Sequence, residues 1–124
     1  MANLFIMLGS IGAGLAVALG AFGAHGLEGK LTERFMQNFQ TGVQYQMYHS
    51  LGLLAIGILA SKAASTSMFV WAGWLMVVGI ILFSGSLYVL SLTGITKLGA
   101  ITPLGGVAFI AGWVLLAIAA VKSL

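Results

Sequence analysis

Four long stretches without a charged residue are the feature of this 124-residue chain that most constrains its fold. They cover residues 1–27, 35–61, 63–96 and 98–121. Each exceeds the ~20 residues that a helix needs to cross ~30 Å of hydrocarbon. Only 6% of the residues are charged, far below the ~25% that is typical of a soluble domain. Because hydrocarbon offers the backbone no hydrogen-bond partner, the pattern predicts membrane-spanning helices.

The expected architecture is all-α: a single integral membrane domain, residues 1–124, that folds as a four-helix transmembrane bundle. We expect the spans near residues 3–24, 43–61, 69–92 and 99–121. The first apolar run lacks a preceding basic region and is too long for a signal peptide, so we expect it to be retained as a helix. With no cysteine in the chain, disulfides and thiolate chemistry are excluded.

The first loop carries an amphipathic helical pattern. Leu31, Phe35 and Phe39 recur every four residues, with polar residues between them. Thr32 is placed to cap the start of such a helix. The pattern predicts an amphipathic interfacial helix that lies on the lipid headgroups, or else an extension of the second span, with Gly42 as the bend between them.

Small residues gather on one face of the first span and on one face of the last. They are Gly9, Ala13, Ala16, Gly20 and Gly23 in the first span and Gly105, Ala108 and Gly112 in the last. Small side chains let membrane helices approach closely, so both faces are expected to pack against helices of this chain or of further copies. The alternative for the first span is a groove that holds a lipid tail or a flat ligand.

The two histidines define a candidate polar cluster at the ends of the first two spans. His25 ends the first span, with Gly26 expected as its left-handed C-cap, and His49 lies inside the second. Both ends face the same side of the membrane, so the two imidazoles lie close together if the first two spans pack side by side; a four-helix bundle can also place these spans diagonally apart. Polar groups within a span must point into the bundle. The candidate members are His25, Gln44, Tyr45, Tyr48 and His49.

Two interpretations of this cluster remain open beside a third, the docking of a partner protein. In the first, His25 caps backbone carbonyls and the tyrosines form a hydrogen-bonded plug with His49. In the second, the cluster binds a haem, a metal, a quinone or a lipid headgroup, since imidazole suits several transition metals. No cofactor is assigned.

Catalytic acids and basic patches are both scarce. The only carboxylates, Glu28 and Glu33, lie in the first loop, which argues against a serine–histidine–acid enzyme and against a proton-coupled pump. The net charge of +3 is spread along the chain and indicates contact with lipid headgroups rather than nucleic acid.

Four motifs in order resemble one protein family. They are "GAFGAHGL", "YQMYHSL", "LFSGSLYVL" and "GAITPLGG", and together they sample the whole chain. The chain is similar to the small four-span membrane proteins of domain of unknown function 423, which include YwdK- and YgdD-like proteins and transmembrane protein 256. The resemblance implies a multi-pass protein of the bacterial plasma membrane, and it supplies no activity and no catalytic residues.

Three hypotheses for the function follow, in decreasing order of preference. The first is a non-enzymatic structural or assembly subunit that contacts lipids, further copies or a larger membrane complex. The second is a small-ligand-binding membrane protein that uses His25 and His49. The third is a small channel or transporter.

Overall fold

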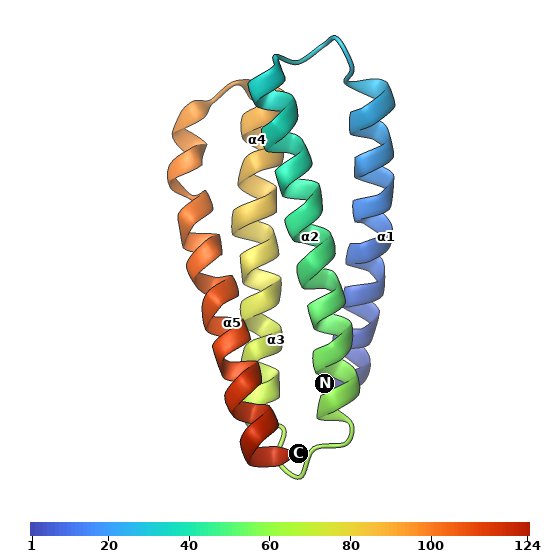
Figure 1. The fold of residues 1–124 in the computed structure, drawn as a ribbon, viewed down its shortest axis with the longest axis vertical. Coiled ribbons are helices and arrows are strands. Elements are labelled where there is room, and N and C mark those ends of the chain that lie inside the picture. Colours follow the sequence, from blue (N-terminus) through green and yellow to red (C-terminus); the bar gives the residue numbers. More distant parts are fainter.

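The computed structural model describes residues 1–124 and contains only helices, which confirms the all-α prediction (Figure 1). The elements are α1 (Ala2–Gly26), α2 (Glu33–Ala60), α3 (Ser67–Gly79), the π-helix η1 (Ile80–Ser84), α4 (Gly85–Thr93), the 3₁₀-helix η2 (Thr96–Ala100) and α5 (Thr102–Ser123). Since α3, η1 and α4 follow one another without a break, the chain forms four long helical rods.

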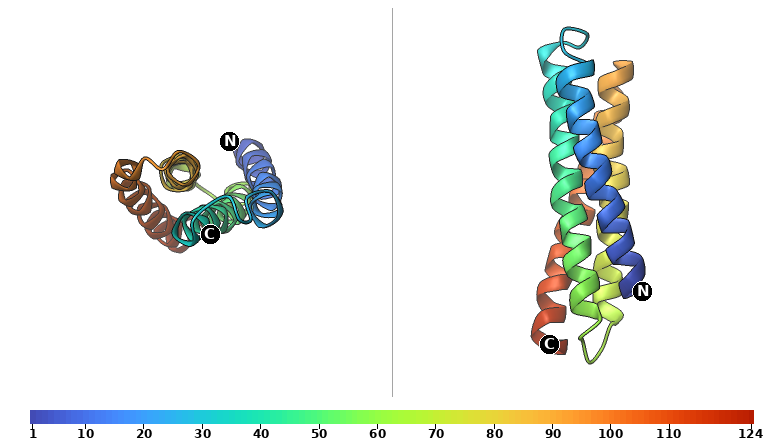
Figure 2. Two further views of the ribbon diagram at one scale, coloured as in Figure 1. Left: turned by 90° about the horizontal axis from the view of Figure 1, so that it is seen from above. Right: turned by 90° about the vertical axis from the view of Figure 1, so that its right-hand side faces the viewer.

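Successive rods run up and down beside each other, and both termini lie at the same end of the bundle (Figure 1). Seen from above, α1 and α5 lie on opposite sides of a central pair formed by α2 and the α3–α4 rod (Figure 2). The most extensive helix contacts are those of α1 with α2 and of α3 with α5. The first two rods are therefore neighbours, while the first and last are far apart.

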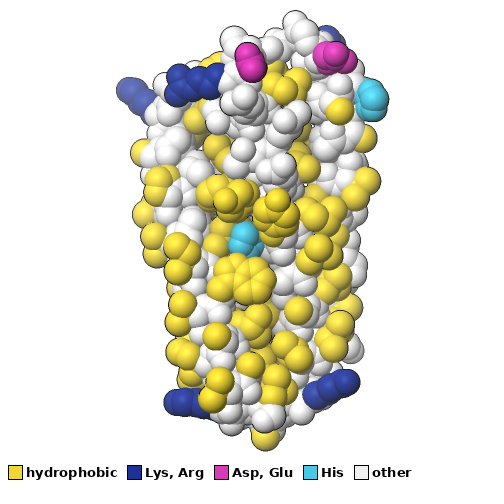
Figure 3. All heavy atoms as spheres, viewed as in Figure 1, with side chains coloured by type: hydrophobic (Ala, Val, Ile, Leu, Met, Phe, Trp, Pro, Cys, Tyr) yellow, Lys and Arg dark blue, Asp and Glu magenta, His cyan; other side chains and the backbone are white.

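Charged side chains are confined to the two ends of the bundle, and the band between them is uncharged on the face that Figure 3 shows. Three segments are long and apolar enough to cross a membrane: Ala2–Gly26, Ser67–Thr93 and Thr96–Ser123. The fourth rod, α2, has 28 residues but carries polar side chains through its first half.

The first loop does not contain a separate interfacial helix. Its amphipathic segment is the beginning of α2, which runs unbroken from Glu33 to Ala60. Of the two expected arrangements, the structure therefore has the extension of the second helix. The backbone N–H of Phe35 donates to Oγ1 of Thr32 at 3.2 Å, which makes Thr32 the N-cap. Gly42 lies inside this unbroken helix. A Cβ there would lie 2.8 Å from Cε1 of Tyr88, so its missing side chain makes room for that ring.

The expected left-handed C-cap at Gly26 is wrong. The helix α1 includes Gly26, and its C-cap is Leu27, which has a negative φ of −102°. Leu27 is buried, which holds the chain against the bundle before it turns. The left-handed residue of this loop is Gly29, three residues after Gly26, with a φ of 74°.

Small residues bring α1 close to α2. A Cβ at Gly9 would lie 2.6 Å from the backbone oxygen of Ser50, and one at Gly23 would lie 2.9 Å from the ring of Phe39. Ala16 is also buried, whereas Ala13 and Gly20 are partly exposed.

The last rod makes an equally close contact with the α3–α4 rod. A Cβ at Gly105 would collide with the backbone of Phe83, and one at Gly112 would lie 3.2 Å from Cε of Met76. Ala108 is buried beside them. Phe83 belongs to the π-helix, whose extra residue per turn shifts the chain at this point.

Candidate functional site

His49 lies near the middle of the bundle, about 22 Å along the helix from Arg34 and about 20 Å from Lys62. Its Nδ1 is 2.7 Å from the backbone oxygen of Tyr45, in the preceding turn of α2. A carbonyl oxygen only accepts, so Nδ1 carries the hydrogen, and Nε2 of the neutral ring is left as an acceptor. Only 5% of the His49 surface is exposed.

Aromatic rings from three elements surround this histidine. Phe109 of α5 stacks on the imidazole, with ring centroids 3.4 Å apart and planes inclined by 9°, and Trp113 follows at 5.7 Å. Tyr45 stacks on Phe83 of η1 at 4.4 Å. We call this surface the aromatic face; it consists of Tyr45, Tyr48, His49, Phe83, Phe109 and Trp113.

Two hydroxyls and one ring nitrogen of the aromatic face have no partner within the chain. Tyr45 and Tyr48 are 37% and 54% exposed, and neither hydroxyl makes a hydrogen bond. Nε2 of His49 makes none either, and it is not completely buried. Figure 3 shows one histidine surrounded by hydrophobic side chains at mid-height.

The structure does not bring the two histidines together. His25 lies in the last turn of α1, is exposed and makes no hydrogen bond, so it caps no carbonyl. Its neighbour Gly23 packs on Phe39, and His49 follows Phe39 by ten residues, or about 15 Å along α2. Figure 3 shows the two histidine side chains well apart. A site that needs both imidazoles of one chain is therefore not assembled.

The remaining member of the predicted cluster is Gln44, one turn before Tyr48 on α2. Gln44 is exposed and makes no hydrogen bond. No group of three or more histidine, cysteine or acidic side chains is placed to hold a metal ion. The part of the predicted cluster that comes together is Tyr45, Tyr48 and His49, and in it Tyr45 and His49 contact Phe109 of α5.

A buried polar network that the sequence analysis missed joins three rods instead. Gln46 donates from Nε2 to the backbone oxygen of Gly12 at 2.8 Å and accepts at Oε1 from the hydroxyl of Tyr88 at 2.6 Å. Ser84 donates from Oγ to the backbone oxygen of Gly42 at 2.7 Å. These bonds connect α2 to α1, η1 and α4.

A sequence signal for Gln46 was present. It lies four residues after Gly42 and three before His49, which places it on the same helical face as those residues, whereas Gln44 points elsewhere. Ser50, one turn further along, is fully buried next to Gly12, and its Oγ has no partner.

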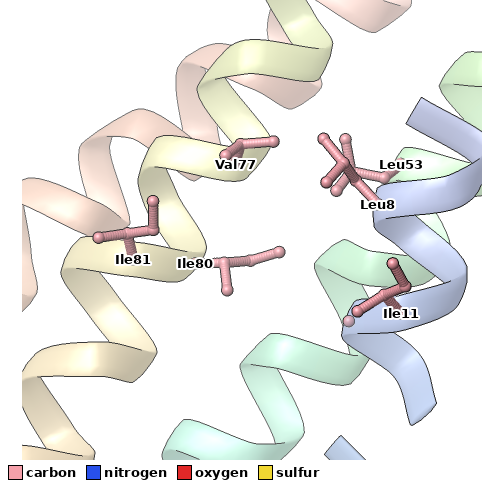
Figure 4. Close-up of a pocket in the computed structure, with 7 residues that line it drawn as sticks. Leu8, Ile11, Leu53, Val77, Ile80 and Ile81 are labelled. Atoms are coloured by element: carbon pink, nitrogen blue, oxygen red, sulfur yellow. The ribbon is translucent and has the colours of Figure 1, made fainter. Parts of the chain in front are cut away.

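A separate apolar cavity of about 150 Å³ lies between α1, α2 and the α3–η1 segment (Figure 4). It is lined by Leu8, Ile11, Gly12, Leu53, Val77, Ile80 and Ile81. Ile11 and Ile81 are 51% and 63% exposed, so the cavity reaches the membrane-facing surface. Its lining matches hydrocarbon, such as a lipid tail, and includes no residue of the aromatic face.

These features define an all-helical membrane protein in which a buried polar network joins three of the four rods. The chain belongs to the family described as "Protein of unknown function (DUF423)", whose model matches residues 19–106. The resemblance inferred from the four motifs is thereby confirmed.

Relatives match over almost their whole length. The UPF0382 membrane protein YwdK of Bacillus subtilis is 60% identical over 98% of this chain and 99% of its own. UPF0382 membrane proteins of Staphylococcus epidermidis and Staphylococcus haemolyticus are 56% and 54% identical, each over 97% of both chains. No solved structure matches.

Proposed function

We propose that this protein is a four-span, multi-pass protein of the bacterial cell membrane that acts without catalysis, as a structural or assembly subunit of a membrane complex or homo-oligomer. The bacterial relatives named membrane proteins support the location. The observation that carries the proposed role is the network around Gln46. The polar groups of this network form hydrogen bonds between the rods and are not presented to a substrate.

The connectivity supports α2 as the fourth span. Its neighbours α1 and α3–α4 are both candidate spans, and the loops that join α2 to them lie at opposite ends of the bundle (Figure 1). If α1 and α3–α4 both cross the membrane, α1 ends on one side of it and α3 begins on the other. The helix α2, which connects these two points, must then cross the membrane as well. At 28 residues α2 extends about 42 Å, which is more than ~30 Å of hydrocarbon requires.

The absence of cysteine makes the topology directly testable. Single cysteines at Lys30, Ser65, Lys97 and Ser123 place one thiol in each loop and one at the C-terminus. A membrane-impermeant maleimide is expected to label only one of two pairs in intact cells, either Lys30→Cys with Lys97→Cys or Ser65→Cys with Ser123→Cys. The other pair is expected to be labelled only in inverted membrane vesicles. Labelling of Lys30→Cys and Ser65→Cys from the same side would rule out α2 as a span.

The subunit role is tested by native mass spectrometry of the protein released from a mild detergent. We expect a defined homo-oligomer or a stoichiometric complex with other membrane proteins. A monomer without protein partners, in the detergent and in nanodiscs alike, contradicts the assembly role.

A second candidate function, the binding of a small ligand, is favoured by one specific observation. The aromatic face presents Nε2 of His49 and two tyrosine hydroxyls without partners at a depth where water is absent. Unpaired polar groups in hydrocarbon are costly, so another molecule in the membrane is expected to satisfy them. In the same native mass spectra, a defined non-lipid mass supports this candidate, and exchangeable lipid alone contradicts it.

A further inference from the structure

We propose that the aromatic face binds a lipid-soluble hydroquinone, a planar ring that carries two hydroxyl groups. This inference rests on the second candidate function and names the chemical class of its ligand. It follows from three properties of the face: the hydrogen-bonding character of His49, the arrangement of the rings, and their depth in the membrane.

The free ring nitrogen of His49 requires a ligand group that donates a hydrogen bond. Because Nδ1 of His49 donates to the backbone oxygen of Tyr45 at 2.7 Å, the neutral ring can only accept at Nε2. The stacked ring of Phe109 holds the imidazole in this orientation. A hydroxyl group meets the requirement, whereas a quinone carbonyl, an ether or an alkyl chain does not. The oxidised form of the ligand is therefore expected to bind more weakly at this atom.

The neighbouring side chains suit a second oxygen and a flat ring. Tyr45 and Tyr48 lie in the turn before His49, with ring centroids 5.7 Å apart and free hydroxyls that can donate. Trp113 of α5 is 42% exposed on the other side of the imidazole. Aromatic rings favour stacked or edge-on contacts with another ring. A hydroquinone can donate to His49, accept from a tyrosine and pack on these rings at the same time.

The depth of the aromatic face in the membrane decides which kind of molecule can supply the hydroxyl group. His49 lies about 20 Å along the helix from the charged residues at either end of α2. Hydroxyls of lipid headgroups lie at the interface, about 15 Å from the midplane of a ~30 Å hydrocarbon layer, so they do not reach it. A hydroquinone dissolved in the hydrocarbon does. The other occupant that can reach this depth is a helix from a second copy of the chain.

The two histidines make a direct spectroscopic test practical. In the His25→Ala variant, ¹⁵N-histidine labelling leaves one imidazole, that of His49, and the exposed His25 has no contacts to lose. The labelled protein in nanodiscs is titrated with trimethylhydroquinone and, separately, with its dimethyl ether, which keeps the ring and lacks the donors. We expect the hydroquinone to shift the Nε2 resonance and the ether to leave it unchanged.

The affinity of side-chain variants for the hydroquinone then shows which groups of the aromatic face contribute to binding. One hydrogen bond contributes about 0.5–1.5 kcal/mol, so His49→Phe is expected to weaken hydroquinone binding by up to about tenfold. Tyr45→Phe is expected to have a smaller effect. The matched control is Tyr88→Phe, whose hydroxyl is already bonded to Gln46 and is not part of the aromatic face.

Two outcomes overturn the proposal. If the hydroquinone leaves the Nε2 resonance unchanged, the ligand class is wrong, and a retained non-lipid mass in the native spectra would still support ligand binding of another kind. If Nε2 is already hydrogen-bonded without hydroquinone, and this signal is lost as the protein is diluted in lipid, the occupant is a second copy of the chain.

Discussion

Gln46 of α2 reaches the backbone oxygen of Gly12 in α1 at 2.8 Å and, through its other amide atom, the hydroxyl of Tyr88 in α4. One side chain thereby ties three rods together inside the band that lacks charges. The contact is close because Gly12 has no side chain, and a Cβ there would meet the hydroxyl of Ser50. A glycine and a glutamine that are 34 residues apart thus set the spacing of α1 and α2.

The Tyr88–Gln46 bond gives the first prediction. Tyr88→Phe leaves the buried Oε1 of Gln46 unpaired, so the free energy of unfolding is expected to fall by about 0.6 kcal/mol, the average for hydrogen bonds between membrane helices, and by no more than about 1.7 kcal/mol. Reversible unfolding in mixed detergent micelles measures this change. Tyr48→Phe removes a hydroxyl that has no partner and is expected to be neutral, so equal losses in both variants would contradict the assignment.

The contact between α5 and the π-helix gives the second prediction. In Gly105→Ala the new methyl group collides with the backbone of Phe83, which cannot rotate away, so we expect a loss of about 1–3 kcal/mol. Gly85→Ala is the matched control, because nothing lies within 4 Å of its Cβ position and alanine favours the helix. The same unfolding assay compares the two, and a neutral Gly105→Ala would mean that the rods pack less closely here.

The N-cap of α2 gives the third prediction. Thr32→Ala removes the acceptor for the N–H of Phe35, and a lost cap costs about 1 kcal/mol. We expect faster amide hydrogen exchange in the first turn of α2, measured by mass spectrometry, and unchanged exchange around His49. Thr66 precedes α3 and makes no capping bond, so Thr66→Ala is expected to leave exchange unchanged. An unchanged first turn in Thr32→Ala would show that tertiary packing, not the cap, holds this end.

The unequal environments of the histidines give the fourth prediction. His49→Ala removes a ring stacked on Phe109, and such contacts contribute about 0.5–1.5 kcal/mol beyond the buried area, so the variant is expected to be clearly destabilised. His25→Ala is expected to match the unaltered protein, because the side chain is exposed and unbonded. If His25→Ala were the costlier change, His25 would have a partner outside this chain.

Helical periodicity predicts which residues of α2 share a face at the candidate site, but it does not predict their partners on other helices. The spacing of Tyr45 and His49 correctly places them on one face of α2, and the same rule includes Gln46 once Gly42 is taken as the reference. The rule does not tell which rod covers that face. A contact of His49 with His25, which the sequence left open, required α1 to cover that face, whereas Phe109 and Trp113 of α5 cover it.

The sequence by itself determined that this chain forms long helices suited to hydrocarbon, because charge-free stretches of that length leave the backbone no other way to bond in lipid. It also determined how α2 begins, since Thr32 caps by a local contact. Only the tertiary structure decided which residues meet across rods. That choice depends on the rotation of each helix about its axis, and here the fit of Gly12, Gly42 and Gly105 against their neighbours sets it.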